Sequence, residues 1–230
     1  MDLKKQDVAE LLAVSMQTID NFIKLEKIPY YILTGEHRFN RQEIENWMID
    51  TLSSEKEQLP FGEVNRENCP WQQFGLYRAI HRGDVLDGVV ANSKYDMIKS
   101  TMDRVADKLF LDAEMVTELL MERENLMPTY LNNGVAAPHT REFLLDGLFD
   151  AVVVVYPSKP IEWGGLDRSL VHTLFFIFAC DDKRHLNLLA KIANFINSKE
   201  CMEFITNRPN KSKLLNFVKQ WEINMSLAIV

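Results

Sequence analysis

Three short apolar runs in the second half of the chain place the strongest constraint on its fold. They span residues 134–137, 151–156 and 171–179, and the last two are rich in Val, Ile and Phe. Runs of this length and composition are typical of buried β-strands. Helical patterns lie before, between and after them. This order predicts an α/β or α+β domain in which a mixed sheet is flanked by helices.

Capping residues and apolar periodicity place the helices of this region. Ser93 and Asp112 each precede an amphipathic pattern, so each is expected to cap a helix. Further patterns predict one helix that begins near Leu186 and another that follows Asn210.

A segment without apolar periodicity divides the chain into two unequal parts. Residues 53–70 contain several residues that break helices and strands, including Pro60 and Pro70. We therefore predict a linker over 53–70, a small first domain over 1–52 and a larger second domain over 71–230.

The composition is that of an ordinary globular protein, since 47% of its 230 residues are hydrophobic and 26% are charged. A formal net charge of −7 argues against strong non-specific attraction to nucleic acid or anionic membranes. The first residues contain no apolar signal-peptide core, and no apolar run is long enough to span a bilayer. We therefore expect a cytoplasmic protein without membrane insertion.

The three cysteines, Cys69, Cys180 and Cys201, are odd in number and lack C-x-x-C spacing. This pattern indicates reduced structural thiols rather than a disulfide framework or a zinc cluster. A zinc site formed by His139, His185 and Cys180 would lack compact ligand spacing. We therefore expect no metal and no cofactor.

Residues 1–52 contain two short helical patterns joined by a tight turn, which predicts a helix-turn-helix. Ser15 is placed to cap the second helix, whose apolar stripe begins at Ile19. Gly35 is placed at the turn of a small hairpin, or wing. Asn40 is then placed to cap a third helix.

The stretch from Leu12 to Ile19, Leu-Ala-Val-Ser-Met-Gln-Thr-Ile, is similar to the core of helix-turn-helix motifs. The order helix, helix, wing, helix resembles the MerR-like or excisionase-type winged DNA-binding domain. In that family the second helix enters the major groove and the wing reaches the DNA backbone. The resemblance implies DNA contacts from six residues: Gln17, Thr18, Asn21 and Lys24 on the second helix, and His37 and Arg38 on the wing.

The charge of the first domain leaves a second interpretation open. Residues 1–52 carry 6 basic and 9 acidic side chains, a balance of −3, whereas phosphate binding favours a positive balance. Asn21 and Phe22 stand where many such domains have an arginine beside an aromatic residue. A small protein-interaction module is therefore the alternative to a DNA-binding domain.

His139 is the leading candidate for chemistry in the second domain. It follows a short apolar run and Pro138, so its ring is expected at a strand end, where α/β folds place functional side chains. A neutral imidazole can act as a nucleophile when one nitrogen keeps its lone pair and a neighbour fixes the hydrogen on the other.

Spaced motifs occur in order along the second domain: Arg123-Glu124, Pro128-Thr129, Gly134-Val-Ala-Ala-Pro-His139, Pro160-Ile-Glu-Trp-Gly164, Val171-His172 and His185-Leu186. Together they resemble the phosphotransferase-system enzyme IIA domains of the fructose/mannitol and nitrogen-regulatory class. The resemblance implies that His139 carries the phosphoryl group and that His185 lies beside it at a helix start. It further suggests Arg123 as a cationic support for the phosphoryl oxygens.

The resemblance implies a regulator that accepts a phosphoryl group on His139 from an HPr-type phosphocarrier and couples it to DNA binding. It implies a phosphohistidine carrier rather than a stand-alone catalyst, with a separate IIB-type or regulatory protein as a further partner. Two alternatives stay open. One is a DNA-binding or scaffold regulator whose second domain senses a partner without phosphorylation. The other is a plain phosphocarrier whose first domain mediates assembly.

Overall fold

The protein is described by a computed structural model, which covers residues 2–12, 14–53, 74–145, 149–164 and 169–227. Most of the predicted linker, together with Cys69, lies outside the described residues. None of the helices within these ranges combines the length and the apolar character that crossing a membrane requires.

The first 53 residues form three helices and a small antiparallel sheet in the order β1-β3-β2. Two predicted caps are confirmed, since the Ser15 hydroxyl accepts from the Thr18 backbone N–H at 3.1 Å and the Asn40 side chain accepts from that of Gln42 at 2.9 Å. Gly35 lies in the hairpin turn with φ +82°. The elements are β1 (Asp2–Lys4), α1 (Lys5–Leu12), α2 (Met16–Lys24), β2 (Tyr31–Leu33), β3 (Glu36–Asn40) and α3 (Arg41–Ser53).

The rest of the chain forms a mixed sheet with the strand order β4-β6-β9-β5, together with a two-stranded sheet of β7 and β8. β4 is parallel to β6, β6 is antiparallel to β9, and β5 is parallel to β9. The strands are β4 (Val85–Val89), β5 (Val135–Ala136), β6 (Ala151–Pro157), β7 (Ile161–Glu162), β8 (Leu170–Val171) and β9 (Thr173–Phe178). The helices are α4 (Gly75–Arg82), α5 (Lys94–Leu109), α6 (Ala113–Leu126), α7 (Asp182–Asn197), α8 (Lys199–Thr206) and α9 (Lys211–Leu227).

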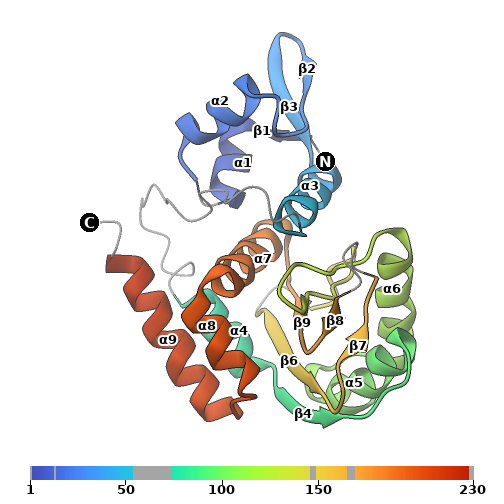
Figure 1. Ribbon diagram of the computed structural model, residues 1–230. Helices are drawn as coiled ribbons and strands as arrows, with labels where there is room; N and C mark the ends of the chain where they lie inside the picture. The colour runs from blue at the N-terminus through green and yellow to red at the C-terminus, as the bar shows by residue number, and fades with distance from the viewer. Residues whose placement is uncertain (1, 13, 54–73, 146–148, 165–168, 228–230) are drawn as a thin grey trace.

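The main sheet is covered by helices on both faces (Figure 1). Alternate residues of β6 enter two separate hydrophobic clusters, as expected for a strand that is buried on both sides. Val152 and Val154 belong to the cluster that includes α4 and α7, whereas Val153 and Val155 belong to the one that includes α5 and α6. The three apolar runs therefore form β5, β6 and β9, and the predicted helix-flanked mixed sheet is confirmed.

Sequence patterns missed several short elements, namely β1, α4, β4 and α8. β4 is an edge strand whose residues Asp87 and Gly88 are exposed, so it lacks the continuous apolar run of a central strand. α4 and α8 have only eight residues each, which gives a short periodic signal.

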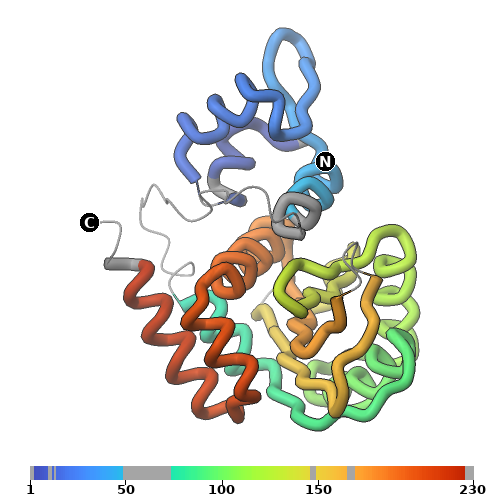
Figure 2. Tube along the Cα trace, viewed as in Figure 1, coloured from blue at the N-terminus to red at the C-terminus, as the bar shows by residue number. Residues whose placement is uncertain are grey.

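The N-terminal elements pack directly against α7, although about 150 residues separate them in sequence (Figure 2). Their buried apolar residues form one continuous cluster with those around α7, including Leu186 and Leu189. An ion pair reinforces the contact, because Arg41 Nη1 at the start of α3 lies 2.7 Å from Asp182 Oδ1 at the start of α7. The first 53 residues therefore cover one end of the larger sheet domain.

Candidate functional site

The parallel pairing of β5 and β9 brings the two candidate histidines together. Both strands end at the same edge of the sheet, and the chain after β5 continues along β9, where Ile177 N donates to Pro138 O at 2.9 Å. His139 is the next residue. β9 leads into α7, whose first turn carries His185. The two ring centroids lie 4.7 Å apart.

α7 begins at Asp182, four residues earlier than the predicted start near Leu186. Asp181 caps the helix, because its side chain accepts from the Arg184 backbone N–H at 2.8 Å and its carbonyl accepts from His185 N at 2.9 Å. These two N–H groups are therefore used within the helix start. His185 contributes to the site through its imidazole.

The hydrogen bonds of His139 define the roles of its two ring nitrogens. Nδ1 lies 2.8 Å from the Ala137 carbonyl oxygen, which can only accept, so Nδ1 carries a hydrogen. Nε2 lies 2.6 Å from Glu45 Oε1, a distance that requires a proton between the two atoms. Nε2 is therefore the nitrogen that faces the centre of the site.

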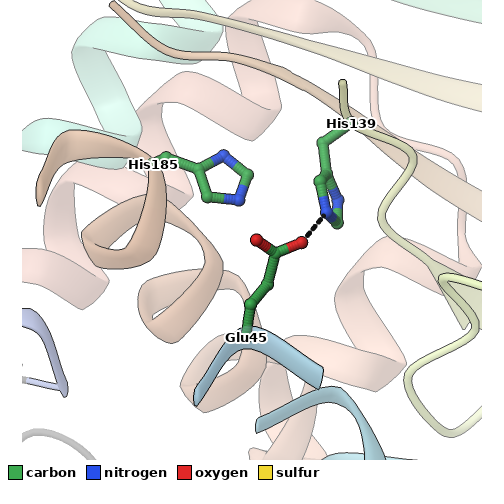
Figure 3. A group of neighbouring side chains, drawn as sticks. All are labelled: Glu45, His139 and His185. Carbon is green, nitrogen blue, oxygen red and sulfur yellow. Dashed lines mark hydrogen bonds and ion pairs between the residues drawn. The ribbon is translucent and has the colours of Figure 1, made fainter. Parts of the chain in front are cut away.

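Glu45 is the member of the cluster that sequence reasoning missed. It extends from α3 into the space between His139 and His185 (Figure 3). Arg123 donates to the same oxygen, Glu45 Oε1, from Nη2 at 3.1 Å and more weakly from Nε at 3.4 Å. All four side chains are buried, with exposed fractions of 1–3%.

The electrostatics of the cluster favour an ionised Glu45 and a neutral His185. Burial would raise the pKa of Glu45, but His139, with further contributions from His185 and Arg123, lowers it well below its ordinary value. Burial, followed by the neighbouring His139, lowers the pKa of His185 to about 3. His185 Nε2 is buried and has no hydrogen-bond partner among the residues that the structure describes. The cluster thus contains one carboxylate, that of Glu45, surrounded by the side chains of His139, His185 and Arg123.

Arg123 also stabilises the end of its own helix. Its Nη1 donates to the Met127 carbonyl at 2.8 Å, which fixes the end of α6. The next residue, Glu124, accepts from both the backbone and the hydroxyl of Thr129 and pairs with Lys94 at 3.2 Å. These bonds hold the loop that leads into β5.

Gly134 begins the segment that carries His139. Its φ of +71° lies in the left-handed region, which glycine adopts without strain. A Cβ here would lie 2.6 Å from His172 Cδ2 and 3.0 Å from the Leu170 carbonyl. His172 itself donates from Nε2 to Asn133 O at 3.0 Å, a contact within the protein scaffold.

Glu45, His139 and His185 have donor types found at zinc sites, and their ligand atoms lie within 4.8 Å of one another. However, Glu45 Oε1 already binds His139 Nε2 and the Arg123 guanidinium, a fixed positive charge that opposes a cation. Cys180, the third residue of the zinc site rejected from sequence, does not belong to this group, and its Sγ lies 3.2 Å from Asp150 Oδ1. We therefore assign no metal to this cluster.

The residues with expected DNA contacts lie on α2 and the β2–β3 hairpin, on the side of the N-terminal elements away from α7 (Figure 1). Gln17, Asn21 and Lys24 are exposed on α2. Thr18 is half-buried, and its hydroxyl lies 2.8 Å from that of Ser15, so it serves the helix cap.

The two residues expected on the wing have local partners. Arg38 Nη2 lies 2.8 Å from Glu36 Oε2, so its charge is paired within the hairpin. The His37 ring packs edge-on against Tyr30 with centroids 5.0 Å apart. The polar side chains of α2 are therefore more accessible to a partner than those of the β2–β3 hairpin.

Comparison with known proteins places the larger domain among phosphotransferase components. The family model described as "Phosphoenolpyruvate-dependent sugar phosphotransferase system, EIIA 2" matches residues 80–221. A nitrogen regulatory protein of Pseudomonas aeruginosa is 29% identical over 147 residues, which cover 62% of this chain and 94% of that protein. The mannitol-specific phosphotransferase enzyme IIA component of Halalkalibacterium halodurans is 27% identical over 129 residues, covering 56% and 86%.

Solved structures show the same fold. The nitrogen regulatory protein IIA-Ntr from Neisseria meningitidis superposes with a TM-score of 0.52 at 22% identity, covering 61% of this chain and 92% of that chain. The mannitol-specific cryptic phosphotransferase enzyme IIA from Escherichia coli gives a TM-score of 0.51 at 16% identity, covering 63% and 98%. The shared region contains His139, His185 and Arg123, whereas Glu45 lies outside the family match.

Proposed function

This chain belongs, through residues 80–221, to the EIIA 2 family of the phosphoenolpyruvate-dependent sugar phosphotransferase system, and we propose that His139 is its phosphoryl acceptor. The observation that carries the proposal is the orientation of His139. The Ala137 carbonyl fixes a hydrogen on Nδ1, and Nε2 points to Glu45 Oε1, the oxygen that Arg123 also binds. The centroid of the His185 ring lies 4.7 Å from that of His139. A nitrogen nucleophile oriented in this way beside cationic and donor groups suits phosphoryl transfer.

The proposed donor is an HPr-type phosphocarrier whose phosphoryl group is also held on a histidine nitrogen. Once His139 Nε2 has released its proton to solvent, its lone pair attacks phosphorus, the nitrogen–phosphorus bond of the donor breaks, and the electron pair of that bond returns to the donor ring. Nδ1 keeps its hydrogen on the Ala137 carbonyl throughout. In this proposal Arg123 and His185 would donate to the phosphoryl oxygens. A IIB-type or regulatory protein would receive the group next, in the cytoplasm.

Labelling with a phosphorylated HPr-type carrier tests the acceptor. We expect one labile phosphoryl group on the wild-type protein and none on His139→Ala, because alanine removes the nucleophile. Mass spectrometry of digested protein checks the attachment site. His172→Ala is the matched control, since His172 lies outside the site, and it should be labelled like the wild type. Equal labelling of His139→Ala would refute the assignment.

We also propose that residues 1–53 form a winged helix-turn-helix domain that binds DNA. The supporting observation is the set of exposed polar side chains on α2, namely Gln17, Asn21 and Lys24, beside an exposed hairpin. A helix with such a face can read bases in the major groove. Coupling between this domain and His139 would make the protein a phosphorylation-dependent regulator.

A gel-shift assay against genomic fragments at moderate salt tests DNA binding. We expect a retarded fragment that Asn21→Ala and Lys24→Ala weaken about tenfold, since each lost base or phosphate contact is worth about 1–3 kcal/mol. Lys99→Ala, on the exposed side of α5, is the control for a general loss of positive charge. Absence of any retarded fragment would favour the protein-interaction alternative.

A further inference from the structure

Glu45 lies where an incoming phosphoryl group would have to lie. Its Oε1 is 2.6 Å from His139 Nε2 and 3.1 Å from Arg123 Nη2, and its carboxylate lies between the two histidine rings (Figure 3). Reacting atoms in phosphoryl transfer must approach within about 3–3.5 Å. With Glu45 in place, no phosphorus atom can reach Nε2.

The contact between Glu45 and His139 also prevents Nε2 from acting as a nucleophile. Nδ1 donates to the Ala137 carbonyl, and the short contact from Nε2 to Glu45 needs a proton between the atoms. An Nε2 lone pair engaged in this way cannot attack phosphorus. Because His139 is 1% exposed, a carrier protein also has no access to the ring while α3 is docked.

The docking of α3 is built from more than one contact. Arg41 lies one helical turn before Glu45, pairs with Asp182 at 2.7 Å and places its guanidinium 5.0 Å from the centre of the Phe143 ring. α1 packs against α7, which adds apolar area to the contact. Residues 1–53 are therefore held on the sheet domain as a unit with Glu45 pointing into the site.

We propose that Glu45 is an intramolecular substitute for the phosphoryl group, so that docking of the N-terminal domain and phosphorylation of His139 exclude each other. This inference rests on the proposed function of His139 as acceptor. In the unphosphorylated protein the carboxylate uses the same nitrogen and the same guanidinium that a phosphoryl group would use. Transfer from the donor requires α3 to withdraw first.

Phosphorylation then prevents the domain from returning. A phosphoryl group carries a charge of about −1.5 to −2 at neutral pH. Once it is bonded to Nε2 and its oxygens accept from Arg123, neither group can bind Glu45. The Glu45 carboxylate would meet a second anion in a buried site, where like charges repel strongly. Because coupling between two equilibria is reciprocal, a partner that binds the released N-terminal domain would also favour the phosphorylated state.

Phosphorylation kinetics test this exclusion. We expect Glu45→Ala to be labelled by a phosphorylated HPr-type carrier at least about tenfold faster than the wild type, because the rate scales with the open fraction. Glu43→Gln, an exposed acidic residue on the same helix, should leave the rate unchanged. Arg41→Ala, which weakens docking without touching the acceptor, should also accelerate labelling. Equal rates for the wild type, Glu45→Ala and Arg41→Ala would overturn the inference.

Small-angle X-ray scattering separates this inference from the proposed function. We expect a larger radius of gyration for Glu45→Ala and for phosphorylated wild type than for the unphosphorylated protein. If no variant accepts label, including Glu45→Ala with a native circular-dichroism spectrum, His139 is not the acceptor and the proposed function fails. If wild type accepts label and remains compact, the acceptor stands and the exclusion by Glu45 is wrong.

Discussion

Replacing Arg123 with alanine is expected to lower the free energy of unfolding by about 3–5 kcal/mol. Arg123 is 1% exposed and holds the Met127 carbonyl as well as the Glu45 carboxylate. Its removal leaves a buried carboxylate that is paired with His139 alone and a carbonyl that has lost a charged donor. Urea unfolding at pH 7, followed by circular dichroism, measures the loss.

A second substitution tests whether the underpaired charge of Glu45 causes the loss of stability in Arg123→Ala. In an Arg123→Ala background, Glu45→Gln removes the underpaired charge and should recover a large part of the stability, so the two changes are not additive. Lys99→Ala breaks an exposed ion pair with Asp103 and should cost no more than about 0.5 kcal/mol. A loss for Arg123→Ala as small as that of Lys99→Ala would mean that the buried pair does not stabilise the native state.

Sequence patterns located the side of the cluster that carries His139 because its signals are local. The apolar run before Pro138 predicted a strand end, and the pairing of β5 with β9 does place His139 at that edge beside His185. The helix start was misplaced because Asp181 was not recognised as the N-cap. Because Asp181 caps the helix, α7 begins four residues earlier than predicted and His185 lies within its first turn.

Glu45 could not be found in the same way, because no local pattern connects it with the site. Glu45 lies 94 residues from His139 in sequence and directly follows Ile44. The apolar residues of α3, such as Ile44, already explain why this helix is packed against the protein, so the pattern gives no reason to look for a further role of Glu45. The only sequence signal is its position next to that apolar face, where a carboxylate needs a buried partner. Such partners come from tertiary contacts across the linker, which composition and periodicity do not specify.

Stability is expected to fall as the pH is lowered from about 6.5 towards 3, through His185. Burial and the neighbouring His139 lower the pKa of His185 from 6.5 to about 3. As the pH falls, His185 is therefore protonated in the unfolded chain before it is protonated in the folded protein. The stability that its neutral form contributes is fully present above pH 6.5 and is lost as the pH approaches 3. A shift of this size corresponds to a loss on the order of 5 kcal/mol. Glu45 acts in the same direction below its unfolded pKa of about 4.5.

Unfolding in urea at pH 7, 5.5 and 4 separates the two contributions. His185→Asn should flatten the dependence between pH 6.5 and 4.5, where Glu45 is ionised in both the folded and the unfolded chain, whereas Glu45→Gln should flatten it only below about pH 4.5. Leu188→Ala removes a buried side chain that does not titrate, so it should lower stability by the same amount at every pH. A wild-type slope in His185→Asn would show that His185 is not the group that takes up the proton. The acid sensitivity follows from the position of this imidazole, because burial beside His139 opposes its protonation in the folded protein.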